Sequence, residues 1–348
     1  MKLIVRVVSA VTLVAAVGFL WNGSAPMHAQ APAIEPLHFH HLHLNSVDPV
    51  AAAAYYPKPF AQTATKTTFN GFEAVKTGNI YILFSKVATA PTNELTGPQT
   101  SVWHFGWNTP NSREYNAKFR SMGLQIAQMW NGNDDDSKLV DLSGDVPSPP
   151  GGGFPTMEQV LDLRAKGAKV DPAVTPGGFG YLRGPDGVMI ENAQSGTAER
   201  FNHVHMYHEH PNCAAEWYAT HLGARRPAGR GGQPPAAAAA APGDCQTKLY
   251  PPPTFPSFAK RGFVRMPGGV TIDEVSISMQ PWPGGGLVST RGHVYDHWAI
   301  STANLDVTVT RLKSEGVKFL EEIHPWGSMR AAMIEGPDRI AIEIVEVK

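Results

Sequence analysis

The sequence predicts an α+β fold built from four related units, and two repeated sets of residues indicate it. The first set is a His-x-His pair with a proline eight residues after the first histidine and a tyrosine fifteen residues after it. It occurs twice, as His41, Pro49 and Tyr56 and as His203, Pro211 and Tyr218. The second set is a histidine followed by threonine at +5, asparagine at +7 and glycine at +19, and it starts at His104 and at His297. Each half of the chain therefore contains two successive units.

Each unit is predicted to open with a short alternating strand, turn through Asp, Pro or Asn, run into a helix, and continue into further strands. The four units span about residues 37–90, 99–195, 200–282 and 292–347. In the third unit, Pro211 and Asn212 begin the helix. In the fourth unit the helix runs from about Leu305 to Ser314, and Gly316 stops it. The apolar face of that helix is predicted to carry Val307, Val309 and Leu312.

Two inserts account for the unequal spacing of the motifs. One covers Asn131–Pro155, and the other, a Pro/Ala/Gly-rich stretch over 225–256, is predicted to be a mobile loop. Two cysteines, Cys213 and Cys245, flank most of the second insert. They can form a disulfide in an oxidising compartment, or Cys213 can lie buried on a helix while Cys245 stays unpaired.

Composition excludes several classes of protein. Of the 348 residues, 42% are hydrophobic and 17% charged, which is enough to build apolar cores. The net charge is −1 without long runs of one sign, so we expect no nucleic-acid partner.

The first 31 residues are typical of a signal peptide. Lys2 and Arg6 precede an apolar stretch, Val7–Trp21, and an Ala29-Gln30-Ala31 cleavage pattern follows. That stretch has 15 residues, whereas a membrane span needs about 20. We therefore expect a protein exported to the periplasm or secreted, without a membrane anchor after cleavage.

Each half ends on a Gly-Pro-Asp motif that lies five residues before a glutamate. Both halves thus offer two histidines and a glutamate in the same order, a donor set that suits Fe, Mn, Zn or Ni and leaves coordination positions open. The predicted metal ligands are His41, His104 and Glu191 in the first half and His203, His297 and Glu343 in the second. Because alternate strand residues share a face, His41 and His43 should point one way, and His38 and His40 the other way, into solvent.

Several of these segments resemble the vicinal oxygen chelate superfamily, which includes glyoxalase I, bleomycin-resistance proteins and extradiol dioxygenases. The segments are 41–49, 203–206, 214–218, 181–191, and 334–338 with 342–343. The resemblance implies βαβββ modules paired into two glyoxalase-like, cup-shaped domains with a divalent metal on each floor. The expected first domain is 32–197 and the second is 198–348.

Three ligands per site favour a dioxygenase-like facial triad. Glyoxalase-type sites typically add a fourth ligand late in the first module, but the corresponding segment, Asn79–Phe84, has no acid. Extradiol enzymes resemble the segment from Tyr181 to Glu191, which makes Tyr181 a candidate catalytic residue, and His205 is a candidate proton carrier. The expected substrate is a small oxygenated molecule. Two alternatives stay open: a glyoxalase-type isomerase or lyase, and a non-catalytic protein that binds a small molecule. The sequence also leaves open which metal is bound, which half of the chain is active, and the oligomeric state.

Overall fold

The computed structural model describes residues 36–93, 98–126, 130–131, 139–140, 179–194, 197–226, 268–282 and 286–348, all within one compact unit, Glu35–Lys348. The predicted signal peptide, most of both inserts and Cys245 lie outside the described residues, so these predictions stay predictions. Among the described residues, no helix combines the length and hydropathy needed to cross a membrane.

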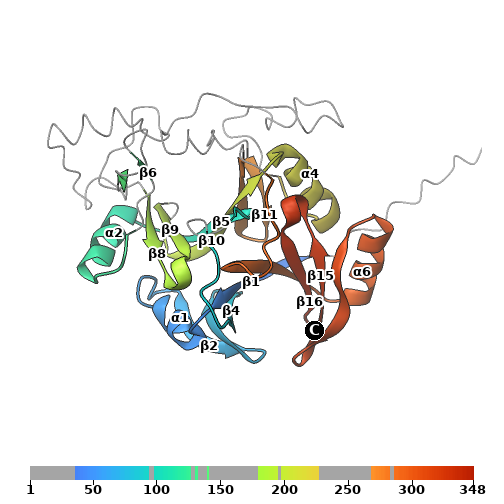
Figure 1. Cartoon of the computed structure of the whole chain (residues 1–348), viewed down its shortest axis with the longest axis horizontal. Helices are drawn as coiled ribbons and strands as arrows, with labels where there is room; N and C mark the ends of the chain where they lie inside the picture. The colour runs from blue at the N-terminus through green and yellow to red at the C-terminus, as the bar shows by residue number, and fades with distance from the viewer. Residues whose placement is uncertain are drawn as a thin grey trace, which may run out of the picture. The chain divides into compact units, whose positions relative to one another are not determined.

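An eight-stranded sheet combines the first and fourth units (Figure 1). Its strand order is β14-β15-β16-β13-β1-β4-β3-β2. The first unit supplies β1 (His38–Ser46), β2 (Ala64–Phe69), β3 (Phe72–Thr77) and β4 (Ile80–Lys86). The fourth supplies β13 (Tyr295–Thr302), β14 (Phe319–Trp326), β15 (Met329–Glu335) and β16 (Ala341–Glu346).

A six-stranded sheet combines the second and third units in the order β11-β12-β10-β5-β9-β8. The second unit supplies β5 (Val102–Thr109), β8 (Phe179–Arg183) and β9 (Met189–Gln194). The third supplies β10 (Arg200–His208), β11 (Gly268–Ile272) and β12 (Val275–Pro281). A separate two-stranded ladder joins β6 (Trp130–Asn131) to β7 (Leu139–Val140).

The pairing of units differs from the expected one. In both sheets the central antiparallel pair joins the two halves of the chain: β1 pairs with β13, and β10 pairs with β5. Residues 32–197 and 198–348 therefore do not each close their own sheet, and that expected grouping is wrong. The opening strands of all four units carry equivalent patterns, so the sequence order does not specify which two of them pair.

The α+β fold class is confirmed. The first and fourth units are complete βαβββ modules, and the described parts of the second and third place one helix between one strand and a later pair. The helices are α1 (Pro49–Tyr55), α2 (Ser112–Ser121), α4 (Pro211–Leu222) and α6 (Leu305–Ser314). Each helix packs on strands of its own unit (Figure 1).

Capping fixes where the helices begin and end. The side chains of Asp48, Asn111 and Asn304 accept a hydrogen bond from a backbone N–H in the first turn of α1, α2 and α6. Gly316, with φ of +78°, follows the last turn of α6 as predicted. The placement of Val307 on the apolar face is wrong, since Val307 is 55% exposed. Thr308 is buried in its place, with its hydroxyl 2.9 Å from that of Thr302.

One continuous apolar core joins the two sheets. On β1, the ring of Phe39 stacks on Trp298 of the same sheet, with centroids 5.7 Å apart, and lies 6.4 Å from Phe201 of the other. Phe60 stacks on Trp107 at 4.1 Å. Burying each such ring stabilises the fold by roughly 2–3 kcal/mol, so the two sheets form one packed body.

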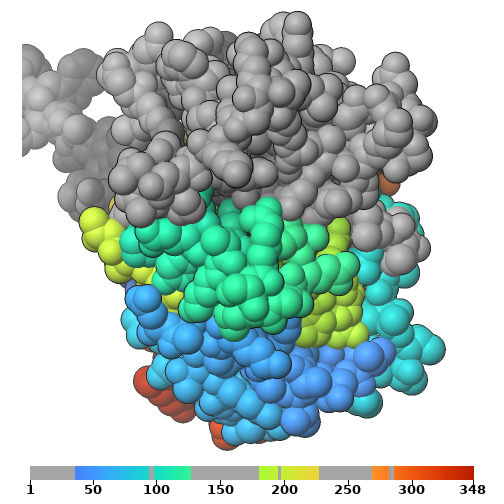
Figure 2. All heavy atoms as spheres, turned by 90° about the vertical axis from the view of Figure 1, so that its left-hand side faces the viewer, coloured from blue at the N-terminus to red at the C-terminus, as the bar shows by residue number. Residues whose placement is uncertain are grey.

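The repeated Gly-Pro-Asp motifs dock the two units of each half on each other. In the first half, the backbone N–H of Val47 donates to Asp186 Oδ1 at 3.1 Å. In the second half, His208 Nδ1 lies 2.5 Å from Asp338 Oδ2. Both aspartates adopt positive φ in their turns, +57° and +55°. Figure 2 shows the blue first unit adjoining the green second unit.

The eight-stranded sheet curls until its two edges meet. The β2–β3 turn at one edge holds Asn70, whose Nδ2 donates to the Trp326 carbonyl at 2.7 Å and whose Oδ1 accepts from Ser328 N at 3.1 Å. Both partners belong to the β14–β15 hairpin at the opposite edge. Seven strand spacings in a flat sheet would separate these edges by roughly 34 Å. We call this pair of hydrogen bonds the Asn70 clasp.

Candidate metal centres

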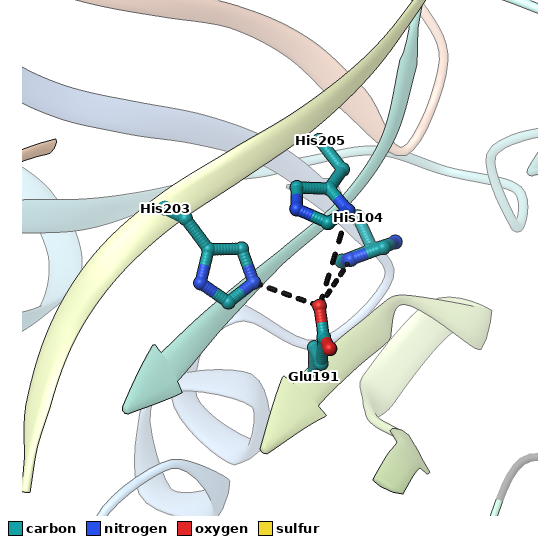
Figure 3. A group of neighbouring side chains, drawn as sticks. All are labelled: His104, Glu191, His203 and His205. Atoms are coloured by element: carbon teal, nitrogen blue, oxygen red, sulfur yellow. Dashed lines mark hydrogen bonds and ion pairs between the residues drawn. The ribbon is translucent and has the colours of Figure 1, made fainter. Parts of the chain in front are cut away.

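Four side chains converge on the six-stranded sheet, and we call this group centre II (Figure 3). Its members are His104 on β5, Glu191 on β9, and His203 and His205 on β10. Glu191 Oε2 lies 2.9 Å from His104 Nε2, 3.0 Å from His203 Nε2 and 3.9 Å from His205 Nδ1. The parallel pairing of β5 with β9 and the antiparallel pairing of β5 with β10 bring these three strands together.

An equivalent group, centre I, lies on the eight-stranded sheet. Its members are His41 and His43 on β1, His297 on β13 and Glu343 on β16. Glu343 Oε2 lies 3.3 Å from His41 Nε2 and 3.7 Å from His297 Nε2. His43 has its ring 4.6 Å from that of His297 and its Nε2 2.8 Å from Ser85 Oγ.

The structure brings all six predicted ligands into metal-type clusters, but in different sets. His41 shares a centre with His297 and Glu343 from the other half. His104 and Glu191 share theirs with His203. The expected triads within each half are therefore corrected. His41 and His203 have changed places relative to the expected triads, because β1 pairs with β13 instead of β5, and β10 pairs with β5 instead of β13.

Two further histidines lie at the centres although neither is among the six predicted ligands. His43 and His205 follow their ligand histidines by two residues and face the same centre, so each cluster offers four donors rather than three. The strand alternation predicted this direction for His43. The structure adds the distances. The possible ligand atoms of His41, His43 and His297 lie within 4.8 Å of one another, and so do those of His104, Glu191, His203 and His205.

His40 departs from the prediction. His38 is exposed as expected, with its side chain 60% accessible, but His40 is buried at 8%. Its Nδ1 lies 2.7 Å from His41 Nδ1, and its ring packs on those of Phe69 and Tyr81. The ladder between β1 and β13 has an extra residue at this point, so the strict alternation fails there. Burial and the neighbouring His41 lower the pKa of His40 to about 3.

Both clusters fit a divalent cation. Donor atoms that share one ion at about 2.1 Å each lie roughly 3 Å apart, close to the 2.9–3.7 Å measured between the glutamate oxygen and the first two imidazoles of each centre. In centre I, the buried atoms His41 Nε2, His297 Nε2 and Glu343 Oε2 face one another, and none has a hydrogen-bond partner among the described residues. A cation is the group that satisfies three converging lone-pair acceptors.

Electrostatics favour positive charge at both centres. Burial raises the pKa of each glutamate, but the two nearest imidazoles outweigh it and hold the pKa of Glu191 and of Glu343 below the usual range. Burial lowers the pKa of His41 and His104. At His297 burial acts the same way, but Asp296 and Glu343 raise its pKa overall. At His41 and His104 a neutral imidazole beside an ionised carboxylate is the protonation state that metal binding requires, whereas the raised pKa of His297 means that a metal must compete with a proton there.

Centre II carries a tyrosine where centre I has a methionine. Tyr181 faces Glu191 across the β8–β9 ladder, and its ring lies 5.2 Å from that of His104. Burial and the carboxylate of Glu191, to which the hydroxyl is hydrogen-bonded, hold the pKa of Tyr181 well above its usual value. Met333 holds the equivalent register position opposite Glu343. The His205 side chain is 15% exposed, the most accessible of the predicted ligands and catalytic residues.

Aromatic side chains cover centre I. The indole of Trp326 stacks on His41 with centroids 5.6 Å apart and planes 4° from parallel, and Phe72 meets His43 edge-on at 4.8 Å. The Asn70 clasp joins the two hairpins that carry these rings. An adjacent cleft of about 1100 Å³ reaches His40, Phe69 and Tyr81, and no ligand of centre I is among its lining residues in the described part of the chain.

Comparisons with known proteins agree with the fold described above. Residues 200–344 match the family model "Glyoxalase/Bleomycin resistance protein/Dioxygenase superfamily". Glyoxalase I from Zea mays has a similar structure, with 13% identity, a TM-score of 0.54, and coverage of 90% of this chain and 93% of the maize chain. A point mutant of the same maize enzyme gives a TM-score of 0.55 at the same identity and coverage.

At this identity the structural likeness shows the fold alone. A search of curated proteins gives no match. The family model covers the third and fourth units, and the structural likeness extends the same fold over both halves. The predicted resemblance to the vicinal oxygen chelate superfamily is confirmed.

Proposed function

We propose, on the premise of this superfamily resemblance, that the chain is a metal-dependent enzyme acting on a small oxygenated molecule, with centre II as its reactive centre. One observation carries the proposal. Two imidazoles and a carboxylate from three strands converge within 2.9–3.0 Å in a buried site, with a third imidazole and a phenol beside them. Burying these groups is unfavourable without a cation between them.

His104, His203 and Glu191 would hold the ion. When bound, a divalent ion supplies Lewis acidity and holds neighbouring oxygens of a substrate. Gln280 Nε2 lies 3.4 Å from His205 Nδ1, and an amide nitrogen only donates, so this imidazole nitrogen is an acceptor that can take a proton. Tyr181 keeps its proton and can donate a hydrogen bond to a developing negative charge.

The reaction class has two candidates. A triad of two histidines and one glutamate favours dioxygenase-like chemistry, because it leaves three positions for substrate and oxygen. The third imidazole at each centre, which makes a fourth donor beside the glutamate, favours a glyoxalase-type isomerase or lyase, since members of that kind typically use four protein ligands. We favour the dioxygenase-like reaction because His205 lies farther from Glu191, at 3.9 Å, than the other two imidazoles do.

Metal analysis and oxygen dependence test these proposals in turn. We expect the purified protein to bind divalent transition metal at close to two equivalents per chain, and less than about a tenth of an equivalent after reconstitution with Fe, Mn, Zn or Ni would overturn the metal proposal. For the reaction class, catechols serve as probe substrates in an oxygen electrode. Oxygen uptake that is abolished by chelator supports a dioxygenase. Oxygen-independent turnover of a carbonyl probe supports the isomerase or lyase.

Export remains part of the proposal and is supported by the residues of the N-terminal segment alone. Cleavage after Ala31 would release the mature chain. The intact mass of the protein recovered from the periplasm of a Gram-negative host checks this. An uncleaved chain confined to the cytosol would contradict it.

A further inference from the structure

Each of the four opening strands contains one extra residue immediately before its first metal-ligand histidine. On β1 the register with β13 skips His40, and on β13 it skips Asp296. On β10 the register with β5 skips Asn202, and on β5 it skips Trp103. These are β-bulges, which turn an extra side chain away from the alternating pattern of the strand. The ligands that follow them are His41, His297, His203 and His104.

Three of the four bulge residues contact the histidine that follows them. His40 Nδ1 lies 2.7 Å from His41 Nδ1, Asn202 Oδ1 lies 2.7 Å from His203 Nδ1, and Asp296 Oδ1 lies 2.7 Å from His297 Nδ1. In every case the contacted atom is the nitrogen that faces away from the glutamate of the centre. Neighbours in a regular strand point to opposite faces, so these contacts require the bulge.

The contact determines which nitrogen can bind a metal. The amide oxygen of Asn202 and the carboxylate of Asp296 only accept, so Nδ1 of the following histidine must donate its proton to them. The lone pair then remains on Nε2, the atom that lies 3.0 Å from Glu191 in His203 and 3.7 Å from Glu343 in His297. A hydrogen-bond acceptor behind a ligand imidazole also fixes its ring orientation and raises its basicity.

His40 performs the same task with a different group. If His41 donates from Nδ1, His40 must accept through the lone pair of its own Nδ1, which leaves its Nε2 protonated. His40 and Asn202 occupy equivalent bulges on β1 and β10. An imidazole in one bulge and a carboxamide in the other thus accept a hydrogen bond from the ligand histidine that follows. Trp103, the fourth bulge residue, has no acceptor side chain, and His104 Nδ1 has no partner among the described residues.

We propose that the bulge residue before a ligand histidine is its positioning residue, with His40 serving His41, Asn202 serving His203 and Asp296 serving His297. The inference rests on the proposed metal function. It assigns a role to three residues that touch a ligand and lie one position before it in the chain.

The test measures Co²⁺ affinity at one centre at a time, by competition with a chelator. A Glu191→Ala background leaves centre I intact. In it, His40→Ala should weaken Co²⁺ binding by roughly 10–100-fold, as loss of such a partner does in known metal sites. His40→Asn should restore binding to within about threefold, because Asn serves the same position on β10. His38→Ala, an exposed histidine two residues away, is the matched control and should change nothing.

The reciprocal set uses a Glu343→Ala background, with Asn202→Ala expected to weaken binding and Asn202→His expected to rescue it. The Co²⁺ absorption spectrum gives a second readout, since a reoriented ligand changes the ligand field while simple unfolding abolishes the spectrum. Unchanged affinity in His40→Ala and Asn202→Ala would overturn the proposal. So would failure of both rescue variants, because packing rather than hydrogen bonding would then be responsible. If neither background binds Co²⁺, the metal function itself fails, and this inference fails with it.

Discussion

At the scale of single residues, both centres are groups of polar side chains that are unfavourable to bury alone. Glu343 is 3% exposed and His41 is fully buried, yet the nearest atoms of these two side chains face each other at 3.3 Å without a hydrogen bond. An unsatisfied buried polar group destabilises a fold by about 1–3 kcal/mol. A bound cation would form coordinate bonds with several of these unsatisfied atoms. We therefore expect the metal to stabilise the fold as well as support chemistry.

The glutamates should be the most sensitive ligands, because each is the one carboxylate among its centre's four donors. We predict that Glu191→Ala and Glu343→Ala each lower bound metal by about one equivalent, since two or three neutral imidazoles hold a hydrated divalent ion weakly. Metal content by mass spectrometry and circular dichroism of the metal-free protein check this. His324→Ala, a partly exposed histidine on β14, is the control. Full metal content in both glutamate variants would refute the ligand assignment.

Sequence offsets alone pointed to the six side chains that the structure brings into the two centres, and strand alternation gave the direction of His43. The same reasoning could not find His40, Asn202 or Asp296 as partners of those ligands. Each immediately precedes a ligand, and strand alternation assigns such a residue to the opposite face. A bulge reverses that assignment. The bulge arises from the register between two strands and not from local sequence. In β1 and β13, the paired residues are at least 251 positions apart in the chain, as are Asn45 and Asp296, which are hydrogen-bonded.

At the scale of elements, local signals were reliable where local chemistry decides the structure. The start of α4 and both bounds of α6 agree with the prediction, because a proline or asparagine begins each helix and a glycine follows it. The buried face of α6 was only partly predicted. Thr308 takes the position assigned to Val307, since a threonine whose hydroxyl is paired can be buried.

The Asn70 clasp is an element-scale device whose effect can be measured. It joins hairpins from opposite edges of one sheet above centre I and depends on one side chain in a turn with φ of +49°. We predict that Asn70→Gly, which keeps the turn but removes both hydrogen bonds, lowers the free energy of unfolding by about 1–3 kcal/mol. Release of metal from centre I should accelerate about tenfold or more.

Stopped-flow transfer of Co²⁺ to a chelator measures this release. In the same mixture, release from centre II provides an internal control, because the described residues of that centre do not contact the clasp. Asn70→Asp keeps the acceptor for Ser328 N and loses the donor to the Trp326 carbonyl, so it should give an intermediate rate. Equal rates in the original protein and Asn70→Gly would show that the aromatic cover alone retains the metal.

At the scale of the whole molecule, the two halves of the chain are exchanged between the sheets. The first and fourth units share one sheet, and the second and third share the other. Four units with equivalent opening strands can pair in more than one way, and either pairing gives each centre at least two histidines and one glutamate. What distinguishes the pairings is long-range packing, such as Phe39 of β1 on Trp298 of β13. Neither composition nor motif spacing reports those contacts.

Pairs of substitutions can determine which grouping the folded protein uses. We predict that His41→Ala combined with Glu343→Ala leaves one metal equivalent of two, because both changes fall on centre I. His41→Ala combined with Glu191→Ala should leave almost none, because it damages both centres. If the sheets formed within each half, the results would be reversed: the pair His41 and Glu191 would spare one site, and the pair His41 and Glu343 would remove both. Metal content per chain, measured on monodisperse protein of native-like circular dichroism, separates the two outcomes without knowledge of the substrate.

The reciprocal pairs test the same grouping from the other centre. His203→Ala combined with Glu191→Ala should retain one equivalent, since His203 shares its centre with Glu191 at 3.0 Å. His203→Ala combined with Glu343→Ala should retain none.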